Sequence, residues 1–509
     1  MAFQGTLTFE RGRIVEIIPS IGKVVIRSEV GIHTYKNAFA YPGFLDSHIH
    51  VFGYGMRITG LSFYSALSAE ECCERALQHT MFRGSWLTGM GWNQELWNDS
   101  SMPTKSILDY YFPSIPVFFT RVDGHAAWVN SQALSLCGIT SSTSNPLGGK
   151  IGKDSSGNPN GILIDTAMEL VRSHIPDFTY AQKSEIIESS LKELSSFGLT
   201  EVHDMDVYND VLPIFRDFAE KGALPLRVQS YIQAQNDEWQ HNRLLPAGGE
   251  LHRICGVKYF MDGAIGSRGA LLFDQYSDDE TTNGISLIEK ESLLTKFKNA
   301  LEEGWQIATH AIGDKANSIV LDLYSHLRTE KIADIHSILR IEHSQTVIPQ
   351  DIEKFAAYSI GAAVQPIHCI SDASMAYRRL GDRCSYSYPW KSLLDAGVVV
   401  GGGSDAPIES PDPRIGLDAF VNRIPFGTSE PWYGSESISM KQALDIYTNL
   451  GHQLTDIGYR RGQIQQKFDA DITIYDTDFE NSNRQKTLNA TVLATYVAGI
   501  KRFSLPNQD

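Results

Sequence analysis

Two histidines separated by one residue, His48 and His50, give this sequence its clearest potential for chemistry. They end a short apolar stretch that follows Pro42 and Gly43, and this arrangement predicts a turn and then a β-strand. Side chains two positions apart in a strand point to the same face. Both imidazoles can therefore bind one metal ion, since neutral imidazole is a common ligand of zinc. The pair also fits a polar strand face, so on its own it leaves both interpretations open.

The composition of the chain narrows the classes of partner and compartment. The 509 residues carry a formal net charge of −16, which argues against nucleic acid or an anionic membrane as a partner. The six cysteines show no C-x-x-C spacing, so we expect free thiols in a reducing compartment. We see no signal peptide at the start and no run of about 20 apolar residues that predicts a membrane span. A cytoplasmic enzyme is the expectation.

Both ends of the chain are rich in short β-like segments. They predict one small β-sandwich domain built from residues 1–42 and 460–509. The candidate strands are Gly5–Glu10, Arg13–Pro19, Gly22–Arg27, His33–Ala40, Ala470–Tyr475 and Val492–Phe503.

The long middle of the chain alternates β-like runs with helix-like stretches such as Gln182–Phe197 and Lys315–Thr329. We therefore expect an α/β fold with a (β/α)8 TIM barrel over residues 43–459. Residues 55–180 are too many for a single helical connection between the first and second barrel strands. They predict a large insertion after the first strand. The first candidate strand ends at His48–His50, and the others are Leu199–Asp204, Leu226–Ile232, Val257–Asp262, Gln306–His310, Ile338–His343, Ser359–Gln365 and Val398–Asp405.

Candidate metal ligands stand at the carboxyl ends of five of these strands, where barrel enzymes place their chemistry. Taken singly, each has an ordinary alternative. A histidine at a strand end is often a hydrogen-bonded core or surface residue, and Asp405 can cap a helix. Taken together they predict a metal centre, because the ordinary interpretation has to explain each position separately. The candidates are His48, His50, Lys258, His310, His343 and Asp405.

Longer motifs around these residues resemble the amidohydrolase superfamily, in the branch of metal-dependent hydrolases related to N-substituted formamide deformylase. The resemblance extends over essentially the whole chain. The inserted tryptophan and Asp-Gly-His motifs are more specific to this branch than the paired histidines. The motifs that carry the resemblance are Pro42–His50, Gly91–Trp97, Asp123–Asn130, Asp262–Arg268, His310–Asp314 and Gly403–Pro407.

The resemblance implies a centre of one or two divalent metal ions per chain, with zinc as the expected metal. One ion lies among His48, His50 and Asp405, and the second is held by His310 and His343. Divalent metal then generates hydroxide from bound water as the nucleophile. Asp405 accepts the proton of that water and passes it to the leaving nitrogen.

Lys258 is implied to be carboxylated on its amine, which gives a carbamate that bridges both ions. Burial beside cations favours this reaction because it lowers the pKa of lysine. A mononuclear site with unmodified Lys258 remains the alternative. Asp262 and Glu342 are expected to orient the ligands. A second ion, His125 or Arg268 is expected to polarise the scissile carbonyl.

Recognition of the substrate is less well determined by the sequence. Trp92 and Trp128 of the insertion either form a lid that contacts a small, partly apolar substrate or belong to the core of the insertion. Gln365 and His368 follow the seventh strand and are further candidate contacts for the substrate.

The predicted function is hydrolysis of a C–N bond in a small molecule, such as an amide or an N-formyl group. The alternatives are hydrolysis of an ester, lactone or cyclic amide, and a non-catalytic homologue that binds a ligand and regulates another process. The glycine-rich segments Gly263–Gly269 and Gly401–Gly403 lack the spacing of a nucleotide-binding loop, and no G-x-S-x-G predicts a serine hydrolase. A homodimer is the assembly that we consider for this chain.

Overall fold

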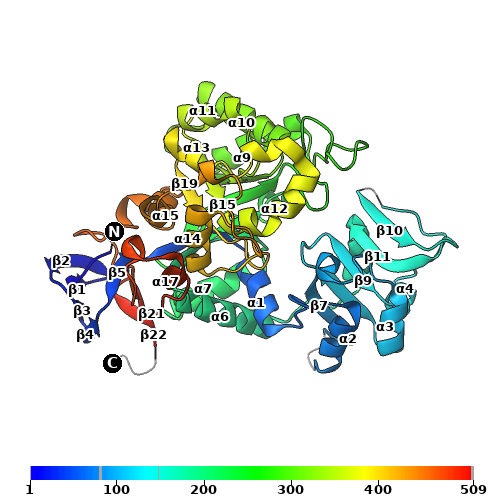
Figure 1. The fold of residues 1–509 in the computed structure, drawn as a ribbon, viewed down its shortest axis with the longest axis horizontal. Helices are drawn as coiled ribbons and strands as arrows, with labels where there is room; N and C mark the ends of the chain where they lie inside the picture. The colour runs from blue at the N-terminus through cyan, green and yellow to red at the C-terminus, as the bar shows by residue number, and fades with distance from the viewer. Residues whose placement is uncertain (1, 80–82, 147, 506–509) are drawn as a thin grey trace. The chain divides into compact units, whose positions relative to one another are not determined.

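The computed structural model describes residues 2–79, 83–146 and 148–505. The chain divides into two compact units, one made of residues 1–51 and 191–509 and the other of residues 52–190. Figure 1 shows the chain coloured from blue at the N-terminus to red at the C-terminus. Among the described residues, no helix combines the length and apolar character needed to cross a bilayer.

Eight parallel strands of the first unit form a barrel, which confirms the predicted fold class. Where the barrel closes, the end of β6 is joined to the segment after β19 by hydrogen bonds from the amide of Asp405 to the carbonyl of His48 (2.7 Å) and from the amide of His50 to the carbonyl of Ala406 (2.8 Å). In order around the barrel the strands are β6 (Phe44–Ile49), β12 (Leu199–Val207), β13 (Arg227–Gln233), β15 (His252–Phe260), β16 (Gln306–Ala311), β17 (Leu339–His343), β18 (Gly361–Val364) and β19 (Val400–Gly402).

Amphipathic helices connect these strands. In α10, Val320, Tyr324 and Leu327 repeat at the spacing of one helical face and are fully buried, which is what packs such a helix against a barrel. The helices of the chain from α6 to its end are α6 (Tyr180–Ser196), α7 (Leu212–Glu220), α8 (Glu238–His241), α9 (Lys290–Glu302), α10 (Asp314–Thr329), α11 (Pro349–Ala357), α12 (Pro366–Leu380), α13 (Trp390–Asp395), α14 (Pro413–Asn422), α15 (Met440–Ile446), α16 (Asn449–His452) and α17 (Arg484–Leu488).

Two four-stranded sheets are built from the ends of the chain. Leu7 and Ile26 of one sheet and Ile472 and Tyr496 of the other belong to a single hydrophobic cluster, so the two sheets share one core. The blue and red strands that meet in Figure 1 belong to the sheet in which β5 pairs with β20. One sheet has the order β2 (Arg13–Pro19), β1 (Gly5–Glu10), β3 (Lys23–Ser28), β4 (Gly31–Lys36), and the other β22 (Ile500–Ser504), β21 (Val492–Val497), β20 (Ile472–Tyr475), β5 (Phe39–Pro42).

Two of the predicted terminal strands are in fact pairs of strands. The segment Val492–Phe503 folds into the antiparallel hairpin of β21 and β22, and His33–Ala40 contains the end of β4 and the start of β5. The breaks fall at Asn37 and Ala498, whose φ angles of 52° and 51° lie in the left-handed region. Asn37 and Gly499 are residues that favour tight turns, but each stands alone within an otherwise β-like run, so the sequence pattern predicts one strand in each case.

The second unit contains the predicted insertion and has a sheet of its own. Its hydrophobic core includes Phe63, Leu108 and Phe119. The sheet has the order β10 (Gly149–Lys153), β11 (Pro159–Asp165), β9 (Ala126–Val129), β8 (Val117–Arg121), β7 (Leu87–Trp92), and the other helices of the chain are α1 (Val51–Thr59), α2 (Ala69–Leu77), α3 (Lys105–Tyr111), α4 (Ser131–Leu136) and α5 (Glu169–Arg172).

Candidate metal centre

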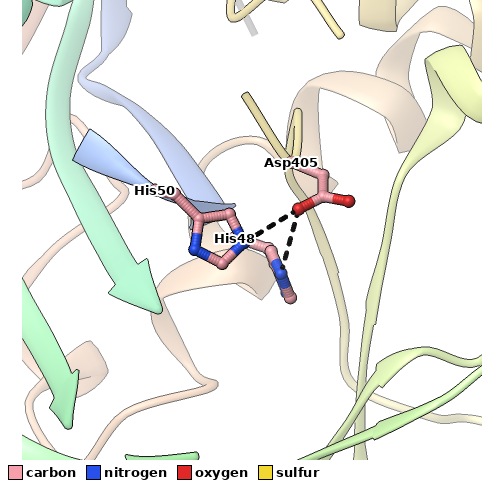
Figure 2. A group of neighbouring side chains, drawn as sticks. All are labelled: His48, His50 and Asp405. Carbon is pink, nitrogen blue, oxygen red and sulfur yellow. Dashed lines mark ion pairs between the residues drawn. The ribbon is translucent and has the colours of Figure 1, made fainter. Parts of the chain in front are cut away.

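The barrel brings His48, His50 and Asp405 together at the carboxyl ends of its first and last strands. Nε2 of His48 and Nε2 of His50 lie 3.4 and 3.2 Å from the same oxygen, Oδ1 of Asp405. Figure 2 shows both imidazoles directed at this carboxylate. The three potential ligand atoms are within 4.8 Å of one another, a spacing that suits a shared metal ion.

Hydrogen bonds fix which ring nitrogen each histidine presents. Nδ1 of His48 lies 2.5 Å from Oε2 of Glu342, and Nδ1 of His50 lies 3.0 Å from the carbonyl oxygen of Met205. Each Nδ1 therefore donates a proton, and the lone pair of Nε2 remains for a cation. Nε2 of His48 is buried and forms no hydrogen bond with any residue that the structure describes. An orphaned buried nitrogen beside a carboxylate is the environment that a divalent cation completes.

Glu342 lies beneath His48 and is in turn held by Arg340, whose Nε is 2.5 Å and Nη2 3.0 Å from its carboxylate oxygens. Burial raises the pKa of Glu342, but the positive charge of Arg340 and the hydrogen bond to His48 outweigh burial and lower it to about 2. The carboxylate is therefore charged at neutral pH and holds the His48 proton on Nδ1. Its position beside His48 is compatible with the orienting role expected for Glu342, which stays a prediction.

Replacement of Glu342 by glutamine is expected to weaken metal binding by about 10- to 100-fold, the usual cost of losing such an orienting partner. Competition with a chelator measures the affinity. Glu353→Gln, an exposed change on α11, is the matched control and should leave the affinity unchanged. Equal affinity in Glu342→Gln and the wild type would show that Glu342 does not orient His48.

A second group of ligand atoms shares Asp405. His343, His368 and Asp405 also offer atoms that lie within 4.8 Å of one another. Nε2 of His368 is 3.6 Å from Oδ2 of Asp405, the carboxylate oxygen that does not face His48 and His50. The sequence indicated His368 as a substrate contact, whereas its position is among the candidate ligands.

His310 lies beside this group and is stacked edge-on against His343, with ring centroids 4.4 Å apart. Its Nε2 is 3.5 Å from the carbonyl oxygen of Gly263 and 3.6 Å from Oδ1 of Asp262, which leaves Nδ1 as the nitrogen available to a cation. Burial and the nearby charge of Lys258 hold the pKa of His310 well below its ordinary value. The imidazole is therefore neutral, as ligation of a metal requires.

Lys258 is almost completely buried on β15, and its Nζ lies 4.5 Å from the centroid of the Phe260 ring. Burial lowers the pKa of this amine, although the negative charges of Glu342 and Asp206 act in the opposite direction. The surroundings of Lys258 therefore favour the uncharged amine more than water does.

Buried aspartates hold the strand ends that carry the ligands. Oδ1 of Asp46 accepts hydrogen bonds from the amides of His48 (3.1 Å) and Ser404 (3.0 Å), which joins β6 to the loop after β19. Asp262 accepts from the amides of Leu271, Ile312 and Gly313, so it supports the backbone beside His310 as well as contacting the ring. The sequence did not indicate this role of Asp46, although the residue begins the Asp-Ser-His-Ile-His segment. A side chain that accepts hydrogen bonds from backbone amides has no sequence motif of its own.

The backbone is also strained at two candidate ligands. His343 and Asp405 have φ angles of 72° and 58°, in the left-handed region that residues other than glycine rarely adopt. Asp206, at the end of β12, has a φ of 57° and interacts electrostatically with His50 and Lys258. Such strain concentrates at functional sites, and Asp206 is a second site residue that the sequence did not indicate.

The two tryptophans proposed as substrate contacts are core residues of the insertion. Trp92 and Trp128 are fully buried in its hydrophobic cluster, and each indole donates to a backbone carbonyl, of Phe119 and Thr104 respectively, at 2.9 Å. Neither indole presents a surface to a substrate in this structure. The substrate-contact prediction for them is therefore replaced by the alternative that the sequence left open.

The other residues predicted to contact the substrate are His125, Arg268 and Gln365. His125 lies in the insertion, with Nδ1 2.9 Å from Oδ1 of Asp165, and both side chains are more than a third exposed. Arg268 forms an ion pair of 3.0 Å with Asp278. Gln365 is buried just before α12, and its Nε2 donates to the carbonyl of Ala363.

A parallel barrel with candidate histidine and aspartate ligands at the carboxyl ends of its strands is typical of metal-dependent hydrolases of the amidohydrolase type. A sequence model described as the amidohydrolase family matches residues 36–500. The chain belongs to this family, and we conclude that it is a metal-dependent amidohydrolase.

Three similar proteins are consistent with this assignment. Protein LONG AFTER FAR-RED 3 of Arabidopsis thaliana is 32% identical over 98% of this chain and 88% of its own length. N-substituted formamide deformylase of Arthrobacter pascens is 26% identical over 99% of this chain and 93% of its own length. The crystal structure of an uncharacterized metal-dependent hydrolase from Pyrococcus horikoshii matches with a TM-score of 0.77 and 25% identity, over 95% of this chain and 99% of that one.

Proposed function

We propose that this amidohydrolase cleaves the C–N bond of a small N-formyl or N-acyl compound at a centre of two divalent ions, with zinc as the physiological metal. The observation that carries the proposal is the convergence of His48 and His50 on one oxygen of Asp405, at 3.4 and 3.2 Å. The family relationship supports hydrolysis of C–N bonds. The name of the Arthrobacter relative, which aligns over nearly the whole chain, supports the N-formyl class.

His48, His50 and Asp405 would hold the first ion, and His310 and His343 would contribute to the second. When bound, such ions lower the pKa of water toward neutrality and polarise the carbonyl of the substrate. The donor set fits, because hydrogen bonds at Nδ1 hold the buried His48 and the partly exposed His50 each in one tautomer, and the carboxylate offsets part of the added charge.

Asp405 is suited to move the proton. Burial raises the pKa of its carboxyl group, but positive charge beside it, that of protonated His48 and His50 or of a cation bound in their place, lowers that pKa well below its ordinary value. Asp405 is therefore ionised at neutral pH and can accept a proton from attacking water at one oxygen. It then delivers this proton to the leaving nitrogen, so that an amine departs as the C–N bond breaks.

Lys258 would bridge the ions as a carbamate. Its neutral amine attacks the carbon of carbon dioxide, an N–C bond forms, and one proton is released to solvent. The product carries a carboxylate whose oxygens suit hard divalent cations. The buried amine and its lowered pKa support this proposal.

A substrate screen tests the proposed function. Chelated protein, with and without added zinc or manganese, is assayed against N-formyl, N-acyl and carbamate compounds and against esters and lactones of matched size. We expect metal-dependent release of amine and formate to be fastest in the N-formyl set. Turnover confined to esters or lactones, or equal rates with and without metal, would contradict the proposal.

A further inference from the structure

His368 lies beside Asp405, among the candidate metal ligands. Its side chain is 9% exposed, and Nε2 forms no hydrogen bond with any described residue. That nitrogen points toward Oδ2 of Asp405 at 3.6 Å, and its ring is nearly parallel to that of His343, with an interplanar angle of 19°. A buried imidazole nitrogen in this position costs free energy unless a ligand satisfies it.

The fold places His368 here by its topology. Strand β18 lies between β17, which ends at His343, and β19, which precedes Asp405. Helix α12 begins directly after β18 with Pro366, so its first turn is positioned between these two residues. Ile367 and Ile370 of this turn pack in a buried cluster with α14, which holds the helix in place.

A carboxylate lies one turn further along α12. Asp372 interacts electrostatically with His368, and its carboxyl group accepts a hydrogen bond from the hydroxyl of Tyr388.

We propose that His368 is a ligand of the second divalent ion, together with His343 and Asp405. The Asp405 carboxylate lies between the two groups of ligand atoms, with Oδ1 facing His48 and His50 and Oδ2 facing His368. This inference rests on the two-ion centre of the proposed function and adds to it a ligand from the first turn of the helix that follows the seventh barrel strand.

Zinc titration of the apoprotein in competition with a chelator tests this assignment. The wild type should bind two ions, and His368→Gln should bind the first with unchanged affinity and the second at least about 100-fold more weakly, beyond the usual loss of an orienting partner. His252→Gln is the matched control, because His252 is buried at the opposite end of β15 and pairs with Ser230. A smaller loss of affinity for the second ion in His368→Gln, or a wild-type protein that binds only one ion, overturns the proposal.

A wild-type crystal soaked with zinc gives an answer that does not depend on folding of the variant. Anomalous scattering should place an ion about 2.0–2.1 Å from a ring nitrogen of His368. An ion more than about 3 Å from both ring nitrogens overturns direct ligation. Both readouts measure ion binding, so failure of every C–N substrate in the screen would refute the proposed function without affecting this result.

Discussion

Replacement of Asp405 by asparagine is expected to lower kcat by about 10²- to 10⁴-fold, the usual contribution of a positioned acid–base group. Asparagine keeps an oxygen that faces His48 and His50, so the first ion should still bind. It has no carboxylate that can take a proton from water and return it to the leaving nitrogen. The variant therefore separates binding of the first ion from proton transfer.

Two measurements on the same preparation check this expectation, namely metal content and kcat for the best substrate of the screen. Asp412→Asn serves as the control, since Asp412 is also largely buried but caps α14 and pairs with Arg414. It should retain wild-type kcat. A wild-type rate in metal-loaded Asp405→Asn would remove Asp405 as the group that transfers the proton.

Removal of the Lys258 side chain is expected to have an effect of similar size. Lys258→Ala lacks the carbamate that would bridge the ions, so we expect it to bind the second ion at least about 100-fold more weakly and to lose most turnover. Alanine also leaves a cavity beside Phe260, and a small anion can enter it.

Chemical rescue distinguishes the carbamate from a free amine. Formate, acetate or propionate should restore part of the lost turnover in Lys258→Ala, because a short carboxylate replaces the carbamate oxygens. Ethylamine of similar size should not. Rescue by ethylamine alone, or full activity without any additive, would show that Lys258 acts unmodified or not at all.

The barrel could be predicted because its strands are apolar runs, several of which end in histidine, lysine or aspartate. Strand β16 illustrates this, since Gln306–Ala311 is buried throughout and includes His310. Parallel strands are covered on both faces, so such runs are distinctive in a sequence. The carboxyl ends of parallel strands meet at one end of the barrel. The sequence alone therefore predicts that His48 lies near Asp405.

Other features depend on side-chain directions that no local pattern encodes. His368 follows β18 at the start of a helix, and its approach to Asp405 depends on the packing of α12. Trp92 and Trp128 have the composition of a binding surface but occupy a core, because aromatic residues suit both. Asp46 acts on backbone amides, which every residue possesses.

Metal analysis of the purified protein tests the central claim most directly. Protein prepared with divalent metal supplied, freed of loosely bound ions and analysed by mass spectrometry, should contain one or two divalent ions per chain. Chelation should abolish hydrolysis, and return of the ion should restore it. A folded protein that holds no divalent ion under these conditions would contradict the assignment of His48, His50 and Asp405 as a metal site.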